Sequence, residues 1–471
     1  MDIRTAVVAW IGIAALSGGC DRTAPTLAER ARDLGGSCVV IVIDAAAAGH
    51  LPTYGYDRDT TPNLDRLAGS SFVFDRAYSQ APMTVMSVPS YLTSLSPHSI
   101  ALRREAKTAS TLVYLPQAFA AAGFRTAGFT ENPVVSMSFP GHEAFELWGG
   151  RLGGRRGAEL TSPDLVERAL AWVDDAGEDR FFLYLHLLPP HAPYLPPEEH
   201  VRFRPPDYTG SLVPTTSVVG AIDRGRREAT PEDVAFLVSQ YDANLHYADA
   251  MIARLLDGLA SRERLDDAVV VVTSDHGEAF GQHGRFGHTS TLYDEMLRVP
   301  LVVRLPEALG VEPRRIEERV PLLDLAPTLA ELFGLGDALG AQAEGRSWLP
   351  VFESTDATHP ERLVFAQRNR QVAAIRGDYK IILTDEDGEL RQEIYRLSDD
   401  PGERENLAGS PDVPLAELRA AVIGFLDGRV EQIGLEATAA TLSAETRLQL
   451  EALGYLGDTE SPKPRPRYVP D

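Results

Sequence analysis

Between residue 38 and about residue 352, apolar runs of two kinds alternate along the chain. Short runs that are almost continuously apolar and rich in β-branched residues are typical of strands that helices cover on both faces. These runs occupy residues 38–44, 124–130, 180–187, 268–275 and 299–305. Longer segments between them place apolar residues at helical spacing, at residues 111–124, 162–177 and 231–262. The alternation predicts an α/β fold with a mixed, mostly parallel sheet flanked by helices.

The pattern changes beyond about residue 353, where shorter apolar stretches alternate with turn signals. Gly377-Asp378 and Asp387-Gly388 are such signals, and they predict an antiparallel meander in a small C-terminal α+β subdomain. The predicted organisation is a signal peptide at residues 1–19, a tether at residues 20–36, a large domain at residues 37–352, the C-terminal subdomain at residues 353–430, and a terminal helix with a tail at residues 431–471.

The first twenty residues read MDIRTAVVAWIGIAALSGGC. The positively charged Arg4 precedes an apolar stretch from Ala6 to Leu16, which is too short to span a bilayer and is followed by small residues. This pattern is typical of a secretory signal peptide, and its end is similar to the lipobox of bacterial lipoproteins, in which Cys20 would be lipidated. We therefore expect an exported protein of the bacterial cell envelope, anchored to the membrane through an N-terminal lipid and facing the periplasm or the outside. A disulfide between Cys20 and Cys38 is the alternative; without it, Cys38 is a small buried hydrophobic residue.

Charge narrows the choice of partners. The chain has 68 acidic and 45 basic residues and a formal net charge of -23, which disfavours binding to nucleic acid. An anionic small substrate would need a locally positive site, and a bound metal ion supplies one against an acidic background.

Acid and imidazole groups lie at the ends of three predicted strands. Asp44 ends the first, His186 and His191 lie at and beyond the end of the third, and Asp275 with His276 ends the fourth. Because ligands collect beyond the carboxyl ends of parallel strands, we expect these groups at one edge of the sheet. Carboxylate oxygens and imidazole nitrogens are good ligands for a divalent ion, although an Asp-His pair alone also occurs as a hydrogen-bonded structural pair.

Ordered sequence blocks resemble those of the sulfatase-like branch of the alkaline phosphatase superfamily. The blocks are VVIVID, SQAPMTVMSVPSYLTSLSPHS, HLLPPHAPY, YDANLHYADAMIARLLDGL, SDHGEAFGQHGRFGHTSTLYDEMLRVPLVVR and PLLDLAPTLAELFGL, from about Cys38 to Leu335. The resemblance implies an alkaline-phosphatase-like fold for the large domain, as a sulfatase-like catalytic domain. It also implies a metal held by an acid after the first strand, an Asp-His pair after a late strand, and the nucleophile. Asp44, Asp275 and His276 match the first three ligands residue by residue.

The position of the nucleophile depends on the register of one block. Sulfatases carry Cys or Ser in a C/S-x-P-x-R motif and oxidise it to formylglycine. Aligning YLTSLSPHS with the family's LLTGLYPHS places the nucleophile at Thr84, with Met86 and Val88 where the motif has proline and arginine. A second register offers Ser87 with Pro89 two residues on, but it has a tyrosine in place of the arginine and needs a deletion of three residues downstream. We prefer the first register, and a formylglycine sulfatase that uses Ser87 is an alternative.

Threonine cannot become formylglycine, so the resemblance narrows to relatives that use an unmodified threonine. These are phosphodiesterases and the transferases of phosphoethanolamine or phosphoglycerol. A threonine hydroxyl is a weak nucleophile at neutral pH, and coordination to a divalent cation stabilises its alkoxide. The expected ligands of one such ion are Asp44, Thr84, Asp275 and His276. Zinc or manganese suits this set best, with magnesium or calcium as alternatives.

Three histidines are candidates for the remaining catalytic tasks. His191 and His288 match the family's positions for stabilising charge on the ester oxygens or protonating the leaving group, and His186 is a third candidate. The expected reaction is hydrolysis or transfer of a phosphate or sulfate ester through a covalent intermediate on Thr84. The expected substrate is an anionic ester, with an envelope glycan or a lipid as candidates.

The segment after Asp44 departs from the family. Relatives show a segment like IDTLRADHLGCYGY, whereas this chain has IDAAAAGHLPTYGY, so no side chain from Ala45 to Gly49 can bind metal or orient a substrate. In one explanation, the site needs only Asp44 from this strand and the pocket is widened for a bulky substrate. In the other, catalysis is lost and an inactive scaffold binds envelope glycan or a protein partner. The presence of all four expected ligands favours the first explanation. Buried acids without partners destabilise the folded protein, so a chain that had lost its metal would be expected to lose them too.

Overall fold

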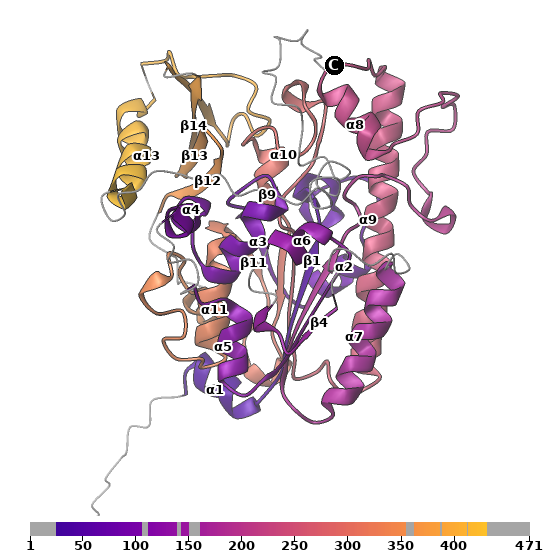
Figure 1. Cartoon of the computed structure of the whole chain (residues 1–471), viewed down its shortest axis with the longest axis vertical. Coiled ribbons are helices and arrows are strands. Elements are labelled where there is room, and N and C mark those ends of the chain that lie inside the picture. The colour runs from indigo at the N-terminus through magenta and orange to yellow at the C-terminus, as the bar shows by residue number, and fades with distance from the viewer. Residues whose placement is uncertain are drawn as a thin grey trace, which may run out of the picture.

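The computed structural model describes residues 25–105, 112–138, 143–149, 161–354, 362–386, 389–411 and 413–430. A large central sheet carries helices on both faces, and a smaller separate sheet lies near one end of it (Figure 1). The predicted signal peptide at residues 1–19, Cys20, and the predicted terminal helix and tail from residue 431 lie outside the described residues.

The strands of the described residues are β1 (Cys38–Ile43), β2 (Phe72–Tyr78), β3 (Arg125–Thr130), β4 (Leu147–Trp148), β5 (Phe181–Leu187), β6 (Val269–Thr273), β7 (Ala279–Phe280), β8 (Phe286–Gly287), β9 (Arg298–Val299), β10 (Leu301–Arg304), β11 (Arg315–Pro321), β12 (Val364–Arg368), β13 (Gln371–Arg376), β14 (Tyr379–Glu386) and β15 (Glu389–Arg396). The α-helices are α1 (Leu27–Leu34), α2 (Pro62–Ala68), α3 (Thr84–Thr93), α4 (Pro97–Glu105), α5 (Leu115–Ala121), α6 (Pro133–Ser138), α7 (Ser162–Ala176), α8 (Thr216–Asp223), α9 (Pro231–Ala260), α10 (Asp294–Leu297), α11 (Leu325–Leu332), α12 (Leu349–Glu353) and α13 (Leu415–Val430).

The central sheet has nine strands in the described part of the chain, and β1 lies near its middle. The strand order is β11-β2-β10-β6-β1-β5-β3-β4, with β9 paired to β2. β1 is parallel to β5 and β6, whereas β10 is antiparallel to β6 and β2, so the sheet is mixed and mostly parallel. All residues of β1 are buried, because helices pack against both faces. The predicted fold is confirmed, and the five predicted strands correspond to β1, β3, β5, β6 and β10.

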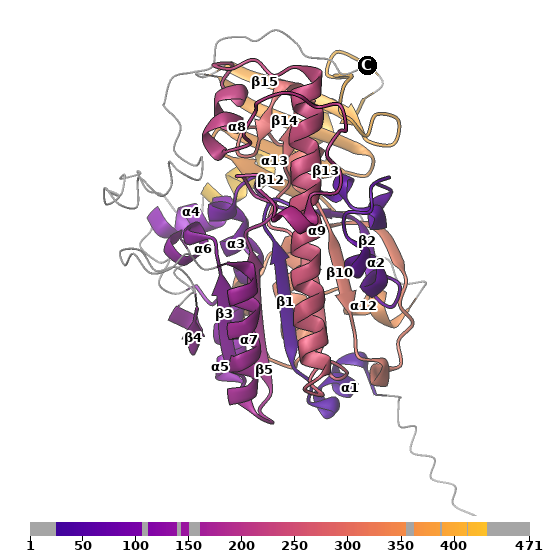
Figure 2. The same cartoon turned by 90° about the vertical axis from the view of Figure 1, so that its right-hand side faces the viewer.

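Helices cover the two faces of this sheet as separate groups (Figure 1, Figure 2). Side chains of α1, α3, α5, α11 and α12 share one buried cluster with the sheet, and side chains of α2, α7 and α9 share the other. The carboxyl ends of β1, β5 and β6 lie together, because Ile43 is level with Leu187 and Val42 is level with Thr273. Within the described residues, no helix has both the length and the apolar character needed to cross a bilayer.

Four antiparallel strands form the smaller sheet in the order β12-β13-β14-β15. Gly377, with a φ of 54°, makes the tight turn between β13 and β14 at the predicted turn signal. α13 packs on one face of this sheet. The other face joins the large domain, where the fully buried Lys380 forms ion pairs with Asp294 and Glu403. The predicted antiparallel meander is confirmed.

The segment expected to be a tether contains α1. Thr26 and Glu29 form a capping box at its start, and Leu27 and Ala31 are buried in the core. An eight-residue helix with only these two inward positions is too short for its apolar period to stand out. The available sequence signal is the capping-box spacing of Thr26 and Glu29. The tether prediction is therefore wrong for residues 27–34, which belong to the folded domain.

Candidate metal centre

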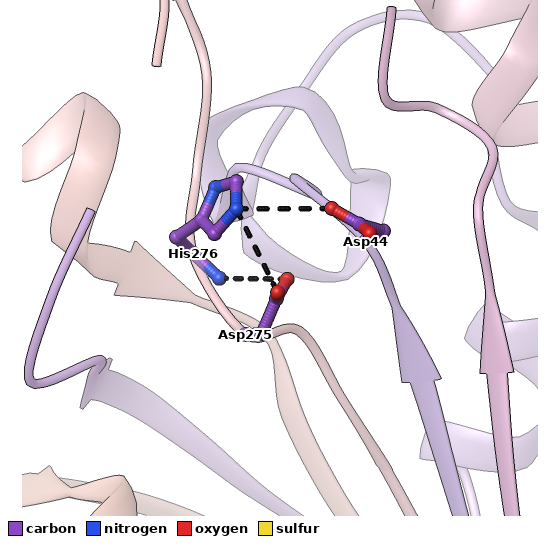
Figure 3. A group of neighbouring side chains, drawn as sticks. All are labelled: Asp44, Asp275 and His276. Atoms are coloured by element: carbon purple, nitrogen blue, oxygen red, sulfur yellow. Dashed lines mark hydrogen bonds and ion pairs between the residues drawn. The ribbon is translucent and has the colours of Figure 1, made fainter. Parts of the chain in front are cut away.

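Two neighbouring strands deliver three potential metal ligands to one point (Figure 3). Asp44 follows β1, and Asp275 and His276 follow β6, the parallel neighbour of β1. One carboxylate oxygen of each acid and a ring nitrogen of His276 all lie within 4.8 Å of one another, and the three residues are fully buried. The structure thus brings these residues together as their positions at strand ends indicated.

The atoms that face one another here are those that a cation would bind. Nε2 of His276 lies 3.7 Å from Oδ1 of Asp44 and 3.6 Å from Oδ2 of Asp275. These two oxygens are buried and accept no hydrogen bond from any described residue. Nδ1 of His276 donates to the carbonyl oxygen of Gly277 over 2.9 Å, so Nε2 is the ring nitrogen that can offer a lone pair to an ion. Ligands about 2.0 to 2.2 Å from a tetrahedral ion lie about 3.3 to 3.6 Å apart, so this donor set fits one divalent ion.

Backbone groups fix the orientation of Asp275. Its Oδ1 accepts from the N–H of Ala45 over 3.2 Å and from the N–H of His276 over 3.1 Å, so Oδ2 is directed toward the other two candidate ligands. Ala45 adopts a φ of 59°, which is strained for a residue with a Cβ. At Gly277, an added Cβ would lie 2.1 Å from the backbone oxygen of Glu295. The turn that carries the Asp-His pair therefore requires glycine after it.

The alanines that follow Asp44 act through their backbone. The N–H of Ala46 donates to Oγ of Ser274, and the N–H of Ala47 donates to the hydroxyl oxygen of Tyr241, each over 2.9 Å. The residues from Ala45 to Ala48 are at most 3% exposed. These four residues open no space to solvent, so within the segment from Ala45 to Gly49 only the exposed Gly49 can border a widened pocket.

The second oxygen of Asp44 is held by two side chains. Oδ2 accepts from Nδ2 of Asn132 over 2.5 Å and from Nε2 of His186 over 3.2 Å. Nδ1 of His186 accepts from the hydroxyl of Tyr184 over 2.9 Å, and the hydroxyls of Tyr184 and Tyr91 lie 2.7 Å apart. Burial would raise the pKa of Asp44, but attraction to the protonated forms of His191, His186 and His276, with the hydrogen bond from His186, outweighs it and holds the pKa well below its usual range. Asp44 is therefore an ionised carboxylate whose Oδ1 faces the centre.

His186 does not occupy the place expected of a catalytic group. It is fully buried on β5, and its two ring nitrogens bond to Asp44 and Tyr184. The structure thus makes it a positioning residue for Asp44. Asn132, the other partner of Asp44, was not predicted; the available signal is its place two residues beyond the end of β3, the parallel neighbour of β5.

The structure brings the predicted nucleophile to the same point. Thr84 is the first residue of α3, and its Oγ1 lies 3.2 Å from Nε2 of His276. Ser87, one turn further along α3, instead bonds to Oγ of Ser79 over 2.9 Å. Ser79 in turn donates to the backbone oxygen of Asp275. Of the two hydroxyls, that of Thr84 is the one next to the candidate ligands.

His191 and His288 lie beside the centre. The ring of His288 is 4.5 Å from that of His276 and 4.6 Å from that of His191, measured between ring centroids. Nδ1 of His191 donates to the carbonyl oxygen of Ala192 over 2.7 Å. Burial lowers the pKa of His191, and burial with the charge of His276 lowers the pKa of His288 to about 3. Both rings are neutral at pH 7 in the metal-free protein.

Glu278 is a second site residue that the sequence did not reveal. It is fully buried, and its Oε1 lies 3.0 Å from Nδ1 of His288. Burial raises the pKa of Glu278 to about 7, against the opposing effect of His191 and His276. The carboxyl group can therefore hold or release a proton near neutral pH. Its only sequence signal is its place two residues after His276.

Two overlapping matches emerge from comparison with known families. Residues 37–335 match the model of the Sulfatase family, and residues 281–422 match the model described as N-sulphoglucosamine sulphohydrolase, C-terminal. The chain is 24% identical over 465 residues to choline-sulfatase of Rhizobium meliloti (strain 1021), which covers 86% of this chain and 88% of the relative. It is 25% identical over 389 residues to iduronate 2-sulfatase of Homo sapiens, covering 69% of this chain and 70% of the relative.

Solved structures share the fold. BT4656 in complex with its substrate, D-glucosamine-2-N,6-O-disulfate, superposes with a TM-score of 0.66 at 18% identity, covering 84% of this chain and 98% of that chain. The phosphonate monoester hydrolase of Agrobacterium radiobacter superposes with a TM-score of 0.65 at 17% identity, covering 84% of this chain and 96% of that chain.

Proposed function

Because the chain belongs to the sulfatase family of the alkaline phosphatase-like superfamily, we propose that it is a metal-dependent hydrolase of sulfate or phosphate esters with Thr84 as its nucleophile. The main observation in favour of Thr84 as the nucleophile is the position of its hydroxyl. Oγ1 of Thr84 lies 3.2 Å from Nε2 of His276, beside two buried carboxylate oxygens that accept no hydrogen bond from a described residue. A hydroxyl in this position can complete the shell of an ion held by the Asp-His pair and Asp44.

The chemistry of the donors supports one small divalent ion. Asp44, Asp275 and His276 would hold it, with zinc or manganese in first place and magnesium or calcium as alternatives. When bound, the ion lowers the pKa of the threonine hydroxyl and withdraws charge from the ester oxygens.

The residues around the centre divide the remaining tasks. Oγ1 of Thr84 loses its proton to water and attacks the sulfur or phosphorus of the ester, the bond to the leaving oxygen breaks, and water then hydrolyses the covalent intermediate on Thr84. Thr84 is the first residue of α3, so the N-terminal end of the helix favours the negative ester group. Glu278, with a pKa of about 7, can hold a proton next to Nδ1 of His288 and so allow Nε2 of that ring to protonate the leaving oxygen. His191 faces the same ring, and once the negative ester raises its pKa and the ring is protonated, its Nε2 stabilises charge on the ester oxygens.

We further propose a sulfated or phosphorylated glycan as the substrate, with a lipid as the alternative and transfer as the alternative to hydrolysis. Support comes from the structural neighbours, one of which has a disulfated glucosamine as its substrate and one of which is a phosphonate monoester hydrolase.

The testing experiment is an assay of the purified chain on a panel of sulfate monoesters, phosphate monoesters and phosphate diesters with zinc, manganese, magnesium or calcium. Turnover is expected for wild type and for Ser87→Ala, and its loss is expected for Thr84→Ala with the metal content mostly kept. Full activity of Thr84→Ala would contradict the proposal. A formylglycine at Ser87 would appear as a mass loss of about two hydrogens on the peptide containing it.

An inactive scaffold that binds glycan or protein is the second candidate. The two acids of the candidate centre argue against it, because one buried oxygen of each carboxylate accepts no hydrogen bond from a described residue, which costs stability unless an ion binds. Metal analysis separates the two candidates, since only the enzyme requires one ion per chain.

We also propose that the protein is exported and anchored in the bacterial cell envelope through a lipid on Cys20. The support is the sequence pattern of residues 1–20, which lie outside the described residues. Metabolic labelling with palmitate tests this proposal: wild type is expected to take up the label and Cys20→Ser is not.

A further inference from the structure

A second group of buried polar atoms lies where the smaller sheet meets the large domain. Arg285 directly precedes β8, and Arg368 ends β12. Nε of both arginines and the hydroxyl oxygens of Ser290 and Thr291 are buried and have no hydrogen-bond partner among the described residues. Native interiors satisfy most buried donors, so four unmet donors on two facing segments require an explanation.

Arg285 pairs with the carboxylate of Asp223, whose negative charge also acts on Arg368. Nη2 of Arg285 lies 3.2 Å from Oδ2 of Asp223, and these side chains are 21% and 16% exposed. Burial and the positive charge of Arg285 lower the pKa of Arg368, and the negative charge of Asp223 only partly opposes them. Nη1 of Arg368 makes a weak contact of 3.5 Å with Oε1 of Gln371. One carboxylate among two guanidinium groups leaves a net positive charge at a largely buried place.

Two backbone hydrogen bonds place this group beside the nucleophile. The N–H of Gln367 donates to the carbonyl oxygen of Gln80 over 2.9 Å, and the N–H of Thr289 donates to the carbonyl oxygen of Pro82 over 3.1 Å. Both segments therefore lie against the residues that lead directly into α3 and Thr84. Arg368 and Ser290 are next in sequence to these anchored residues, and Thr291 follows Ser290.

We propose that Arg285 and Arg368, with the hydroxyls of Ser290 and Thr291, bind a second anionic group of the substrate, a sulfate, beside the ester that Thr84 attacks. Guanidinium forks and hydroxyls are the donors that recognise such oxyanions, and a bound sulfate both neutralises the excess positive charge and accepts from the unmet donors. The inference rests on the proposed function and narrows its substrate to molecules with at least two anionic groups. It also gives the C-terminal subdomain a part in the site, because Arg368 belongs to β12.

The test measures how strongly a second sulfate improves binding. The metal-loaded full-length Thr84→Ala protein, which cannot turn over, is titrated in a calorimeter with glucosamine 2-N,6-O-disulfate and with glucosamine 6-O-sulfate. We expect the disulfate to bind about tenfold more tightly or better, as hydrogen bonds to charged groups provide. When Arg285→Gln or Arg368→Gln is added to the Thr84→Ala protein, the ratio of the two dissociation constants should fall to near one.

The matched control is Arg376→Gln in the same sheet, where the arginine is 46% exposed and pairs with the exposed Glu417. This variant should keep the preference for the disulfate. Arg368→Lys keeps the charge without the guanidinium fork, so it should fold as wild type and retain only part of the preference. Thermal unfolding followed by circular dichroism identifies any variant that does not fold.

Equal affinities for the two sugars, or a preference that persists in both glutamine variants, would overturn the inference. Turnover of simple esters by the wild type separates this failure from that of the proposed function. If the wild type turns over simple esters but shows no preference for the disulfate, only the second-sulfate site is rejected. If the preference is seen without turnover, only the proposed hydrolase function is rejected.

Discussion

Nε2 of His186 lies 3.2 Å from Oδ2 of Asp44, so the histidine holds one oxygen of a carboxylate whose other oxygen faces Nε2 of His276. The hydroxyl of Tyr184 bonds to the far nitrogen of His186 and fixes the tautomer in which Nε2 carries the proton. A buried chain of side chains thus sets the direction of a candidate metal ligand without touching the centre itself.

His186→Ala is expected to weaken metal affinity about 10-fold to 100-fold, as is usual when a partner of a metal ligand is lost. Tyr184→Phe should have a smaller effect in the same direction, because the imidazole remains. Competition with a chromophoric chelator measures both. His50→Ala is the control, because His50 bonds to Asp242 and not to Asp44. Unchanged affinity in His186→Ala would show that Asp44 needs no such support.

Asp275→Asn should abolish stabilisation by metal while leaving the metal-free protein as stable as wild type or more so. The reason is that Oδ2 of Asp275 and Oδ1 of Asp44 both face Nε2 of His276, and removing one negative charge relieves their repulsion. Wild type should gain about 2.7 kcal/mol when metal is 100-fold above its Kd, and the variant should gain almost nothing. Thermal unfolding with and without metal measures the difference; a metal-free variant that melts well below wild type would contradict the explanation.

Glu278→Gln should change how stability depends on pH. Burial raises the pKa of Glu278 to about 7 in the folded protein, above its ordinary value of 4.5. A group with a raised pKa contributes its full stability below the unfolded value and loses it as the pH rises through the folded value. Between pH 4.5 and pH 8, metal-free wild type should therefore lose up to about 3 kcal/mol relative to Glu278→Gln. Urea unfolding measures the difference in stability between wild type and Glu278→Gln at pH 5 and again at pH 8. The same difference at both pH values would rule out the raised pKa.

Gly277→Ala should destabilise the protein by about 3 kcal/mol and reduce metal binding. Its Cβ would lie 2.1 Å from the backbone oxygen of Glu295, so the turn after the Asp-His pair must move. Gly49→Ala is the control, because a Cβ there meets nothing within 4 Å. Denaturant unfolding of both variants measures the effect, and similar midpoints for the two would contradict the close approach.

The central sheet and the four candidate ligands could be predicted because both depend on simple regularities. Continuous apolar runs mark strands buried on both faces, and parallel strands bring their carboxyl ends to one edge. This places Asp44 beside Asp275 and His276 without any knowledge of side-chain packing. These regularities do not locate Thr84, because it lies at the start of a helix and not at the end of a strand. Only the resemblance to a family located it.

Residues that act through packing could not be predicted. Asn132 and Glu278 show no periodic pattern of their own, and their roles depend on which side chains the fold places next to them. His186 was a third candidate for the tasks of His191 and His288, but its ring nitrogens bond to Tyr184 and Asp44 instead. The electrostatic influence of Asp223 and Arg285 on Arg368 depends on how the smaller sheet docks, which no local pattern in the sequence encodes.

The most direct test of the central claim is a crystal structure of the protein loaded with zinc or manganese, with the ion located by its anomalous scattering. The account predicts one ion per chain, bonded to Oδ1 of Asp44, Oδ2 of Asp275, Nε2 of His276 and Oγ1 of Thr84 at about 2.0 to 2.2 Å. An ion bound elsewhere, or one at this place whose coordination shell excludes Thr84, would contradict it.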